Sequence, residues 1–566
     1  MRIRFRFLRW LFLLGIVLPI RPAIAQSTDE AHWRAVARAD LDAVYKTIVE
    51  AHPGAIDAAN PSFRIWMEDG YRQALARLPD VTDYSTALNA VRWYVTGFRD
   101  GHLILSDDTR PADELNPSKG WGVALRHGHF VVTNVAADWP APLPPTGATV
   151  LSCDGRSPQA IATEDVAPYI DRRDLPLSRQ EAAEFIGEPV LAMGKRLKSC
   201  TFTPPDSHAV MTLNVVYRPL TFEDWASIIS DHRPQRVRIN DYDPRDGLLW
   251  IRAQNFYPDH EQYAALESML RRLRHLHGVR AIVFDVRGNG GGNSEIGGMI
   301  FEAATGGLQY DHRGLERLPA IYAEWRVSAI SIEAAKTGLA NALRVSGPGS
   351  STVNWFRDHL RSLLVAQAAG KPWARQDMGE RRLTRDEMKH RYARLRRFSG
   401  PIAVLTDEYC MSACLDFVDL VRQVPGALQL GATTGADSVY IDTGTVRLPS
   451  GNHLILPLKV WRNRLRGNNE ALVPDITYDG DLDDDAAVRR WVVSVLARRG
   501  FTAAVTAGSS GNPAVSGAPG HRVRGDEVAN KETKCRYCYP KAGRRQSATP
   551  TALQSMLAAS CSSPAR

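Results

Sequence analysis

The N-terminal part of the chain repeats apolar side chains at intervals of three and four positions, the spacing of one buried helix face. The segments AHWRAVARADLDAVYKTIVEAH and STALNAVRWYVTGFRDGHLIL both follow this pattern. The periodicity therefore predicts an N-terminal helical region over residues 26–115.

Between residues 119 and 219 the pattern changes to short alternating runs, which are typical of strands. GWGVALRHGHFVVTNVA and TGATVLSCDGRSPQAI contain such runs, with turns at His127 and Asp154. The arrangement resembles a PDZ domain with a helical insertion near residues 165–200, although an unrelated small β domain would show the same runs. GWGV stands where PDZ domains place the loop that binds a peptide carboxylate. Gly120 and Gly122 are therefore candidate substrate-binding residues.

Residues 236–500 alternate buried strands with amphipathic helices. The strands are LLWIRAQNF, VRAIVFDV, PIAVLTDEY and ALQLGATT, and the helices include HEQYAALESMLRRLRHL and MSACLDFVDLVRQV. This alternation predicts an α/β core with a largely parallel sheet and a site at the carboxyl ends of its strands. Residues 308–398 interrupt the core. They are Arg-rich and helical in pattern without a strand signal, so we expect a helical insertion, a candidate lid.

The first 25 residues have the pattern of a signal peptide. Four arginines precede an apolar run from Trp10 to Ile20, and Ala23-Ile24-Ala25 is a small-x-small cleavage site. A membrane anchor is the alternative, but a spanning helix needs roughly 20 apolar residues. We therefore expect a cleaved leader, a periplasmic or secreted protein and no stable membrane span. Residues 502–566 are rich in Ala, Gly, Ser, Pro and Arg, which predicts a disordered basic tail.

The charge is unevenly distributed along the chain. The formal net charge is +8, but the leader holds five Arg without an acid, and the tail holds nine Lys or Arg against three Asp or Glu. The body between them is slightly acidic, at −3, which argues against nucleic acid as a partner. The length of 566 residues and a hydrophobic fraction of 44% predict several domains with sizeable cores.

Seven cysteines fall into three groups. Cys153 and Cys200 are a plausible disulfide within one domain of an exported protein. Cys410 and Cys414 either pair or pack as small apolar side chains. Cys535-x-x-Cys538 has no second ligand pair nearby, so we expect no metal site and no cofactor.

A glycine cluster follows the strand AIVFDV. In Arg287-Gly288-Asn289-Gly290-Gly291-Gly292, successive glycines let backbone N–H groups converge on an anion. The third position of a dinucleotide fingerprint is Asn293, and no phosphate-loop lysine follows. An oxyanion cradle is the better functional interpretation, and a tight turn is the structural alternative.

Ser412 stands where a buried strand passes into a helix. Such a position exposes a side chain and directs the free N–H groups of the first helical turn at whatever the hydroxyl attacks. Serine is also a common helix cap, so the position alone does not distinguish a nucleophile from a cap.

The series DVRGNGGG, VLTDEYCMSAC, LGATTGADS and ALVPDI resembles the tail-specific, or C-terminal processing, serine peptidase family. The resemblance covers residues 119–482 and implies a ClpP/crotonase-like α/β core joined to a PDZ-like domain. It implies that Ser412 is the nucleophile. It also implies an oxyanion hole formed by Gly290 or Gly291 together with Ala413.

The sequence departs from the family's familiar Ser/Lys branch. The position of its lysine holds Asp437, which cannot act as a neutral-amine base. The segment Asp100-Gly101-His102 is similar to that of the tricorn-core and retinoid-binding-protein-like branch, which uses a histidine base and a glutamate before V-P-D. The resemblance thus implies His102 as general base and Glu470 as its orienting carboxylate.

Both assignments have alternatives in the sequence. His102 also suits a structural histidine, and Glu470 a solvated loop carboxylate. Asp100, Asp416 and Asp419 lie near His102 or Ser412 in sequence and are alternative orienting groups. The predicted function is an exported serine endopeptidase that cleaves polypeptide by acyl-enzyme chemistry. A catalytically impaired ligand- or peptide-binding protein of the same fold and a non-peptide ester hydrolase are the alternatives.

Overall fold

The computed structural model describes residues 23–502, apart from residue 192 and the segments 231–236, 307–320 and 378–397. The predicted leader, except for its last three residues, therefore lies outside the described residues. So do all but the first residue of the predicted tail and the Cys535-x-x-Cys538 pair. In the described part of the chain, no helix has the length and apolar character needed to cross a membrane.

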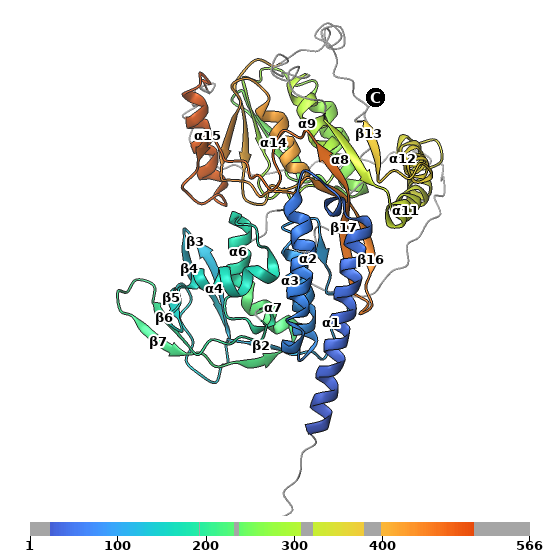
Figure 1. The fold of residues 1–566 in the computed structure, drawn as a ribbon. Coiled ribbons are helices and arrows are strands. Elements are labelled where there is room, and N and C mark those ends of the chain that lie inside the picture. Colours follow the sequence, from blue (N-terminus) through green and yellow to red (C-terminus); the bar gives the residue numbers. More distant parts are fainter. Residues whose placement is uncertain (1–22, 192, 231–236, 307–320, 378–397, 503–566) are drawn as a thin grey trace, which may run out of the picture.

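A six-stranded sheet forms the centre of the C-terminal half (Figure 1). Its order is β18-β15-β14-β11-β10-β9, and all neighbours are parallel except the edge strand β9. One face packs on α8, α9 and α14, and the other packs on α15. Every residue of β11 and β14 is buried, as expected for strands covered on both faces. The bounds are β9 Asn240–Arg245, β10 Leu248–Ala253, α8 His260–Leu273, β11 Ala281–Asp285, α9 Ser294–Thr305, β14 Ile402–Thr406, α14 Ala413–Arg422, β15 Leu428–Gly431, β18 Ile476–Thr477 and α15 Asp485–Ala497.

A second sheet joins distant parts of the chain. Its order is β1-β17-β12-β13, with β16 also paired to β17. Strand β1 follows the N-terminal helices α1–α3, which pack with this sheet in one apolar cluster. The bounds are α1 Ala23–Ala51, α2 Pro61–Leu75, α3 Tyr84–Thr96, β1 Ile104–Leu105, β12 Tyr322–Arg326, β13 Trp373–Asp377, β16 Tyr440–Arg447 and β17 His453–Arg462.

The insertion at residues 308–398 is not purely helical, contrary to the prediction. Helices α11 (Ala329–Ser346) and α12 (Ser351–Ala368) are present, but β12 and β13 flank them. The two strands pair with each other, and β12 also pairs with β17. Each is only five residues long, and one of the two partners of β12 is the distant strand β17, so local pattern carried little signal.

In the sequence, a smaller β domain lies between the N-terminal helices and the α/β core. Its antiparallel sheet has the order β3-β4-β5-β6-β7, and β3 is an edge strand. Helices α4–α6 cover it, and the disulfide between Cys153 and Cys200 joins the facing strands β5 and β6. The bounds are β2 Asn116–Ser118, β3 Trp121–Arg126, β4 His129–Val135, β5 Thr149–Cys153, α4 Pro158–Ile161, α5 Ala167–Ile170, α6 Pro176–Glu184, β6 Ser199–Thr203, β7 Met211–Asn214, β8 Arg218–Leu220 and α7 Phe222–Ile229.

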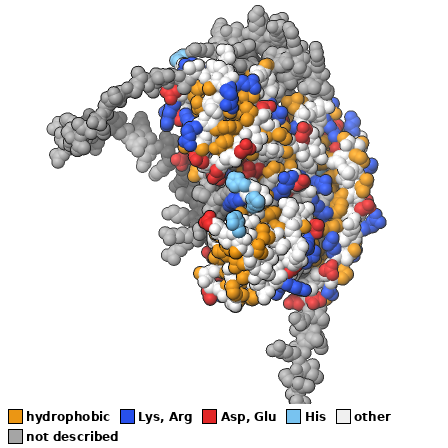
Figure 2. All heavy atoms as spheres, turned by 90° about the vertical axis from the view of Figure 1, so that its left-hand side faces the viewer, with side chains coloured by type: hydrophobic (Ala, Val, Ile, Leu, Met, Phe, Trp, Pro, Cys, Tyr) orange, Lys and Arg blue, Asp and Glu red, His pale blue; other side chains and the backbone are white. Residues whose placement is uncertain are grey.

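The surface shown in Figure 2 mixes charges of both signs. Lys and Arg side chains are interspersed there with Asp and Glu, and apolar side chains lie between them. Among the described residues, no group of three or more His, Cys, Asp or Glu is arranged to hold a metal ion.

Candidate active site

Ser412 lies on the tight turn between β14 and α14. Its backbone has φ +53° and ψ −122°, a conformation that non-glycine residues rarely adopt. Although Ser412 precedes the first residue of the helix, its side chain makes no capping hydrogen bond. The alternative of a helix-capping serine therefore loses its main support. Backbone strain of this kind is concentrated at functional sites.

A disulfide spans this turn. Cys410 and Cys414 are bonded across Ser412, and both side chains are fully buried. Of the two roles that the sequence allowed for these cysteines, pairing is the one observed. The bond ties the end of the β14 segment to the first turn of α14, which restricts the backbone that carries the hydroxyl.

The glycine cluster after β11 lies directly against Ser412. A Cβ atom on Gly291 would sit 2.8 Å from the Ser412 Cβ and 3.1 Å from the Ala413 backbone nitrogen. Gly291 has φ +101°, which also disfavours a side chain. The loop is held by Asn289, whose side-chain nitrogen donates to the Ala253 carbonyl at 2.7 Å. Close approach to Ser412 thus explains the glycine.

The orientation of the N–H groups favours one of the two predicted oxyanion donors. The Gly291 N–H already donates to Asn289 Oδ1 at 2.9 Å. Within the described residues, no acceptor is recorded for the N–H groups of Gly290 and Ala413. These two groups are therefore available to an oxyanion, and Gly291 serves chiefly as the close-packing position.

A buried carboxyl supports the start of the glycine cluster. Asp407 accepts hydrogen bonds from the backbone N–H groups of Gly288 at 2.7 Å and Tyr409 at 3.1 Å. Burial, followed by the charge of Glu408, raises the pKa of the Asp407 carboxyl to about 8. Asp407 thus connects the glycine loop to the end of β14 through a group that titrates near neutral pH.

His102 reaches the core because β1 pairs with β17. Ile104 and Leu105, just after the histidine, pair with Ile455 and Leu454. The His102 ring is 14% exposed, and its Nδ1 is buried without a hydrogen-bond partner in the described structure. The nearest recorded carboxylate contact is 4.0 Å, from Nδ1 to Asp100 Oδ1.

The hydrogen bond between Ser412 and His102 is not formed in this structure. No partner is recorded for either the Ser412 hydroxyl or the His102 Nε2 within the described residues. The loop that carries Asp437 packs against the turn that carries Ser412, since a Cβ on Gly435 would meet the Met411 side chain at 2.5 Å. Hydrogen bonds of catalytic groups are often long before substrate binds, so the absent bond is compatible with the predicted pairing.

The structure does not record a contact between Glu470 and His102. The Glu470 carboxylate instead accepts the backbone N–H of Gly467 in its own turn, and the residue is exposed. Its neighbour Asn469 does reach the N-terminal region, donating to the Arg99 carbonyl at 2.7 Å. The loop therefore lies near His102, while the Glu470 carboxylate is engaged within the loop.

Asp437 occupies the position of the absent lysine and is the centre of a buried ionic cluster. Arg464 and Arg466 both contact its carboxylate, at 2.8 and 3.1 Å. Arg466 continues to Asp416 and Asp419 on α14. Two of the alternative orienting carboxylates are therefore committed to an arginine, and the cluster fixes the Asp437 loop to the helix that begins at Ser412.

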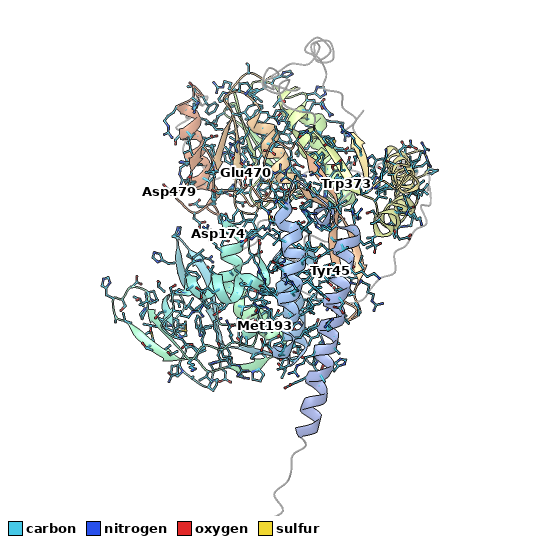
Figure 3. The ribbon with its side chains drawn as sticks, in the orientation of Figure 1. Tyr45, Asp174, Met193, Trp373, Glu470 and Asp479 are labelled. Carbon is cyan, nitrogen blue, oxygen red and sulfur yellow. A yellow bond between two sulfur atoms is a disulfide. The ribbon has the colours of Figure 1, made fainter. Side chains whose placement is uncertain are left out.

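Two hydrogen bonds join the β domain to the edge of the site. Arg173 Nη1 donates to the Ala436 carbonyl at 2.9 Å, and Gln180 Nε2 donates to Glu408 at 2.8 Å. Figure 3 shows Glu470 in the lower part of the core and Asp174, which precedes α6, at the top of the β domain below it. The β domain thus meets the core at Glu408, four residues before Ser412, and at Ala436.

Gly120 and Gly122 are both buried. A Cβ on Gly120 would meet the Trp139 ring at 2.5 Å, and one on Gly122 would meet the Ile228 carbonyl at 2.3 Å. Close packing therefore explains both glycines without a ligand. Their assignment to substrate binding stays a prediction.

Residues 247–478 match the model of peptidase family S41. They run from β10 to β18 and include the glycine cluster and Ser412. The α/β core belongs to peptidase family S41. The chain is accordingly a serine-type peptidase, a hydrolase.

Solved structures share the fold of this chain. Mature CPAF matches at a TM-score of 0.52 and 12% identity, covering 83% of this chain and 99% of its own. Mature CPAF complexed with lactacystin matches at 0.52 and 12%, covering 82% and 100%. At such identity the likeness shows the fold alone. No curated protein sequence matches this chain.

The sequence prediction missed one part of the site. His52, which lies in the N-terminal helical region, contacts Asp100 through its Nε2 at 3.1 Å. His52 precedes a Pro-Gly pair at the end of a helix. The one sequence signal for a role of this residue is that a histidine stands in an otherwise apolar pattern. Its partner is 48 positions away, so local spacing gave no indication of the contact.

Proposed function

We propose that this S41 peptidase is an exported endopeptidase in which Ser412 is the nucleophile and His102 the general base. The observation that carries the proposal is the Ser412 turn. Its hydroxyl makes no capping bond, its backbone is strained, and it lies against a glycine loop beside two available N–H groups. This combination is what acyl transfer requires of a nucleophile and an oxyanion hole.

In the acylation step, Ser412 Oγ attacks the scissile carbonyl carbon and its proton passes to His102 Nε2. The carbonyl oxygen becomes an oxyanion that accepts hydrogen bonds from the N–H groups of Gly290 and Ala413. The C–N bond then breaks as His102 returns the proton to the leaving amine, which leaves an ester on Ser412. Water hydrolyses that ester by the same sequence, with His102 taking its proton.

The β domain would guide the substrate. β3 is one of the two edge strands of its sheet, and edge strands accept extended peptides by strand addition. The contact of α6 with Glu408 lies four residues before the nucleophile, so a peptide held beside β3 would be led toward Ser412. This role corresponds to the predicted PDZ-like function.

Export is supported by the leader pattern and by the two disulfides, since such bonds persist in oxidising compartments. N-terminal sequencing of the protein recovered from the periplasm or the medium tests this part. A mature N-terminus at Gln26 is the expected result, and recovery of unprocessed protein in the cytoplasm would contradict it.

The chemistry is tested by labelling the mature protein with a fluorophosphonate. We expect one label, on Ser412, with loss of casein and peptide cleavage in both the labelled protein and Ser412→Ala. His102→Ala should lower kcat by several orders of magnitude. A wild-type protein that takes no label would favour the catalytically impaired binding protein, and cleavage of esters without peptides would favour the ester hydrolase.

A further inference from the structure

We propose that Asp100, held from behind by His52 and Ser438, is the carboxylate that positions the His102 imidazole. The inference rests on the proposed function, because it assigns a partner to the proposed base. It replaces Glu470 in that role and adds two positioning residues that lie far from Ser412 in the sequence.

His52 is fixed in one tautomer. The backbone N–H of Gly54 donates to His52 Nδ1 at 3.0 Å, so that nitrogen carries a lone pair. The ring proton is therefore on Nε2, which donates to Asp100 Oδ2 at 3.1 Å. The ring stacks on Phe63, with 4.4 Å between the ring centroids, and both the His52 and Asp100 side chains are essentially inaccessible. His52 is thus an immobile donor to Asp100.

The other carboxylate oxygen of Asp100 is also held. It accepts the Ser438 hydroxyl at 2.7 Å and the His102 backbone N–H at 3.0 Å. The Ser438 oxygen in turn accepts the Tyr440 N–H at 3.1 Å, which directs the hydroxyl proton away from that group. Three donors from three segments therefore fix the orientation of a single buried carboxylate.

These donors keep Asp100 charged. Burial alone would raise the pKa of the Asp100 carboxyl, but the hydrogen bond from His52, the neighbouring histidines and the bond from Ser438 hold it below the ordinary range. A buried carboxylate that is kept charged in this way can stabilise a neighbouring side chain when that side chain becomes cationic.

His102 is that group. Its Nδ1 is buried, lacks a partner in the described structure and lies 4.0 Å from Asp100 Oδ1. A small rotation of the ring turns this distance into a hydrogen bond, which places the proton on Nδ1 and leaves Nε2 free to accept the Ser412 proton. The imidazolium that then forms is stabilised by the Asp100 charge.

Other charged groups face the same space and set the background for any pH measurement. Asp437 interacts electrostatically with His102, and Arg173 lies against Gly101 and interacts with Asp100. Both keep strong partners of their own: Asp437 pairs with Arg464 and Arg466, and Arg173 pairs with Asp171. Asp100 differs from both in that its Oδ1 lies within 4.0 Å of the His102 Nδ1.

The test compares Asp100→Asn, His52→Leu and His52→Gln with Glu470→Gln. We expect Asp100→Asn to lower kcat roughly 100-fold or more with little change in KM. It should also move the acidic limb of the kcat/KM profile to lower pH, because the imidazolium loses its anion. His52→Leu should lower kcat and move that limb in the same direction. His52→Gln, which keeps a donor to Asp100, should restore most of the activity.

The control is the exposed His453–Asp108 pair, whose atoms are 2.8 Å apart outside the site. Asp108→Asn and His453→Gln should leave kcat and the pH limb unchanged. The assignment is overturned if folded Asp100→Asn has wild-type kcat, or if Glu470→Gln alone lowers kcat and moves the limb. If Asp100→Asn fails to fold, the two His52 variants test the assignment instead. Equal activity of His52→Leu and His52→Gln would then overturn the proposal.

The fluorophosphonate experiment separates this inference from the function on which it rests. A wild-type protein without label at Ser412 removes the proposed function itself. A labelled, active wild type with unchanged Asp100 and His52 variants removes only the positioning assignment.

Discussion

Gly291 lies so close to Ser412 that a Cβ atom on the glycine would sit 2.8 Å from the Cβ of the serine. The two residues are 121 positions apart in the sequence, and they meet because β11 and β14 are parallel neighbours whose carboxyl ends share one edge of the sheet. Their contact brings the proposed oxyanion loop and the proposed nucleophile together. It also makes the site sensitive to a single methyl group.

Gly291→Ala should therefore reduce kcat/KM roughly 100-fold, the order seen when an oxyanion-hole donor is lost. The new methyl group would also press on the Met411 carbonyl, again at 2.8 Å. Gly298→Ala is the matched control, since a Cβ there meets nothing within 4 Å and lies in helix α9. Steady-state kinetics with a peptide substrate measure both. A fully active Gly291→Ala enzyme would show that the loop is not packed on the nucleophile.

The disulfide across Ser412 should matter more for activity than for stability. Cys410 and Cys414 close a short loop, with a sequence separation of 4, so the chain-entropy model gives roughly 2 kcal/mol for this bond. We expect Cys410→Ala with Cys414→Ala to lower kcat about 10-fold, because the turn that holds the hydroxyl loses its covalent restraint.

The other disulfide provides the comparison. Cys153 and Cys200 are separated by 47 positions, for which the same model gives roughly 4 kcal/mol. Replacing both with alanine should lower the unfolding midpoint of the β domain. This variant should keep a larger share of the wild-type kcat than the variant without the disulfide at Ser412. If the two double variants lose the same fraction of kcat, the bond at Ser412 has no special role in positioning.

Asp437 should be essential for stability. Burial opposes its ionisation, but Arg466 and Arg464 hold the pKa of this carboxyl below its ordinary value. A carboxyl whose pKa falls on folding stabilises the protein above its unfolded pKa, and that contribution disappears as the pH falls through the folded value. Asp437→Asn should therefore cost roughly 3–5 kcal/mol at neutral pH, and much less near pH 3.

Urea unfolding at both pH values measures this loss. The exposed pair of Asp174 and Arg179 is the control, and Asp174→Asn should change stability by less than about 1 kcal/mol. Asp437→Lys should unfold rather than create a Ser/Lys enzyme, since it would bury a third cation beside two arginines. A folded, active Asp437→Lys protein would contradict the role given to the cluster.

The Asp407 carboxyl should make stability fall toward alkaline pH. Its pKa is raised to about 8 in the folded protein, so the folded state binds more protons than the unfolded state between about pH 4 and pH 8. The stabilisation is complete below the unfolded pKa and is lost as the pH rises through about 8. Asp407→Asn should flatten this decline, as measured by the unfolding midpoint between pH 5 and pH 9. An unchanged slope in the variant would show that other groups cause the decline.

Local pattern determined much of the core. The buried strands AIVFD and IAVLT, the glycine run after the first and the serine after the second are contiguous features, and the α/β class and the position of Ser412 follow from them. The length of the apolar runs decided the strands, and the chemistry of glycine and serine decided the candidate site.

Only the tertiary structure determines which residues far apart in the sequence contact each other. β12 and β13 have little pattern of their own; β12 pairs with the distant strand β17, and β13 pairs with β12. His102 reaches the core only through the pairing of β1 with β17, and the contacts of Asp100 with His52 and Ser438 depend on the same packing. A sequence motif shows which groups are present, whereas the orientation of a carboxylate depends on donors supplied by several segments. For this reason the sequence could name Ser412 and His102 as candidates, but the contacts on which we propose Asp100 in place of Glu470 come only from the three-dimensional structure.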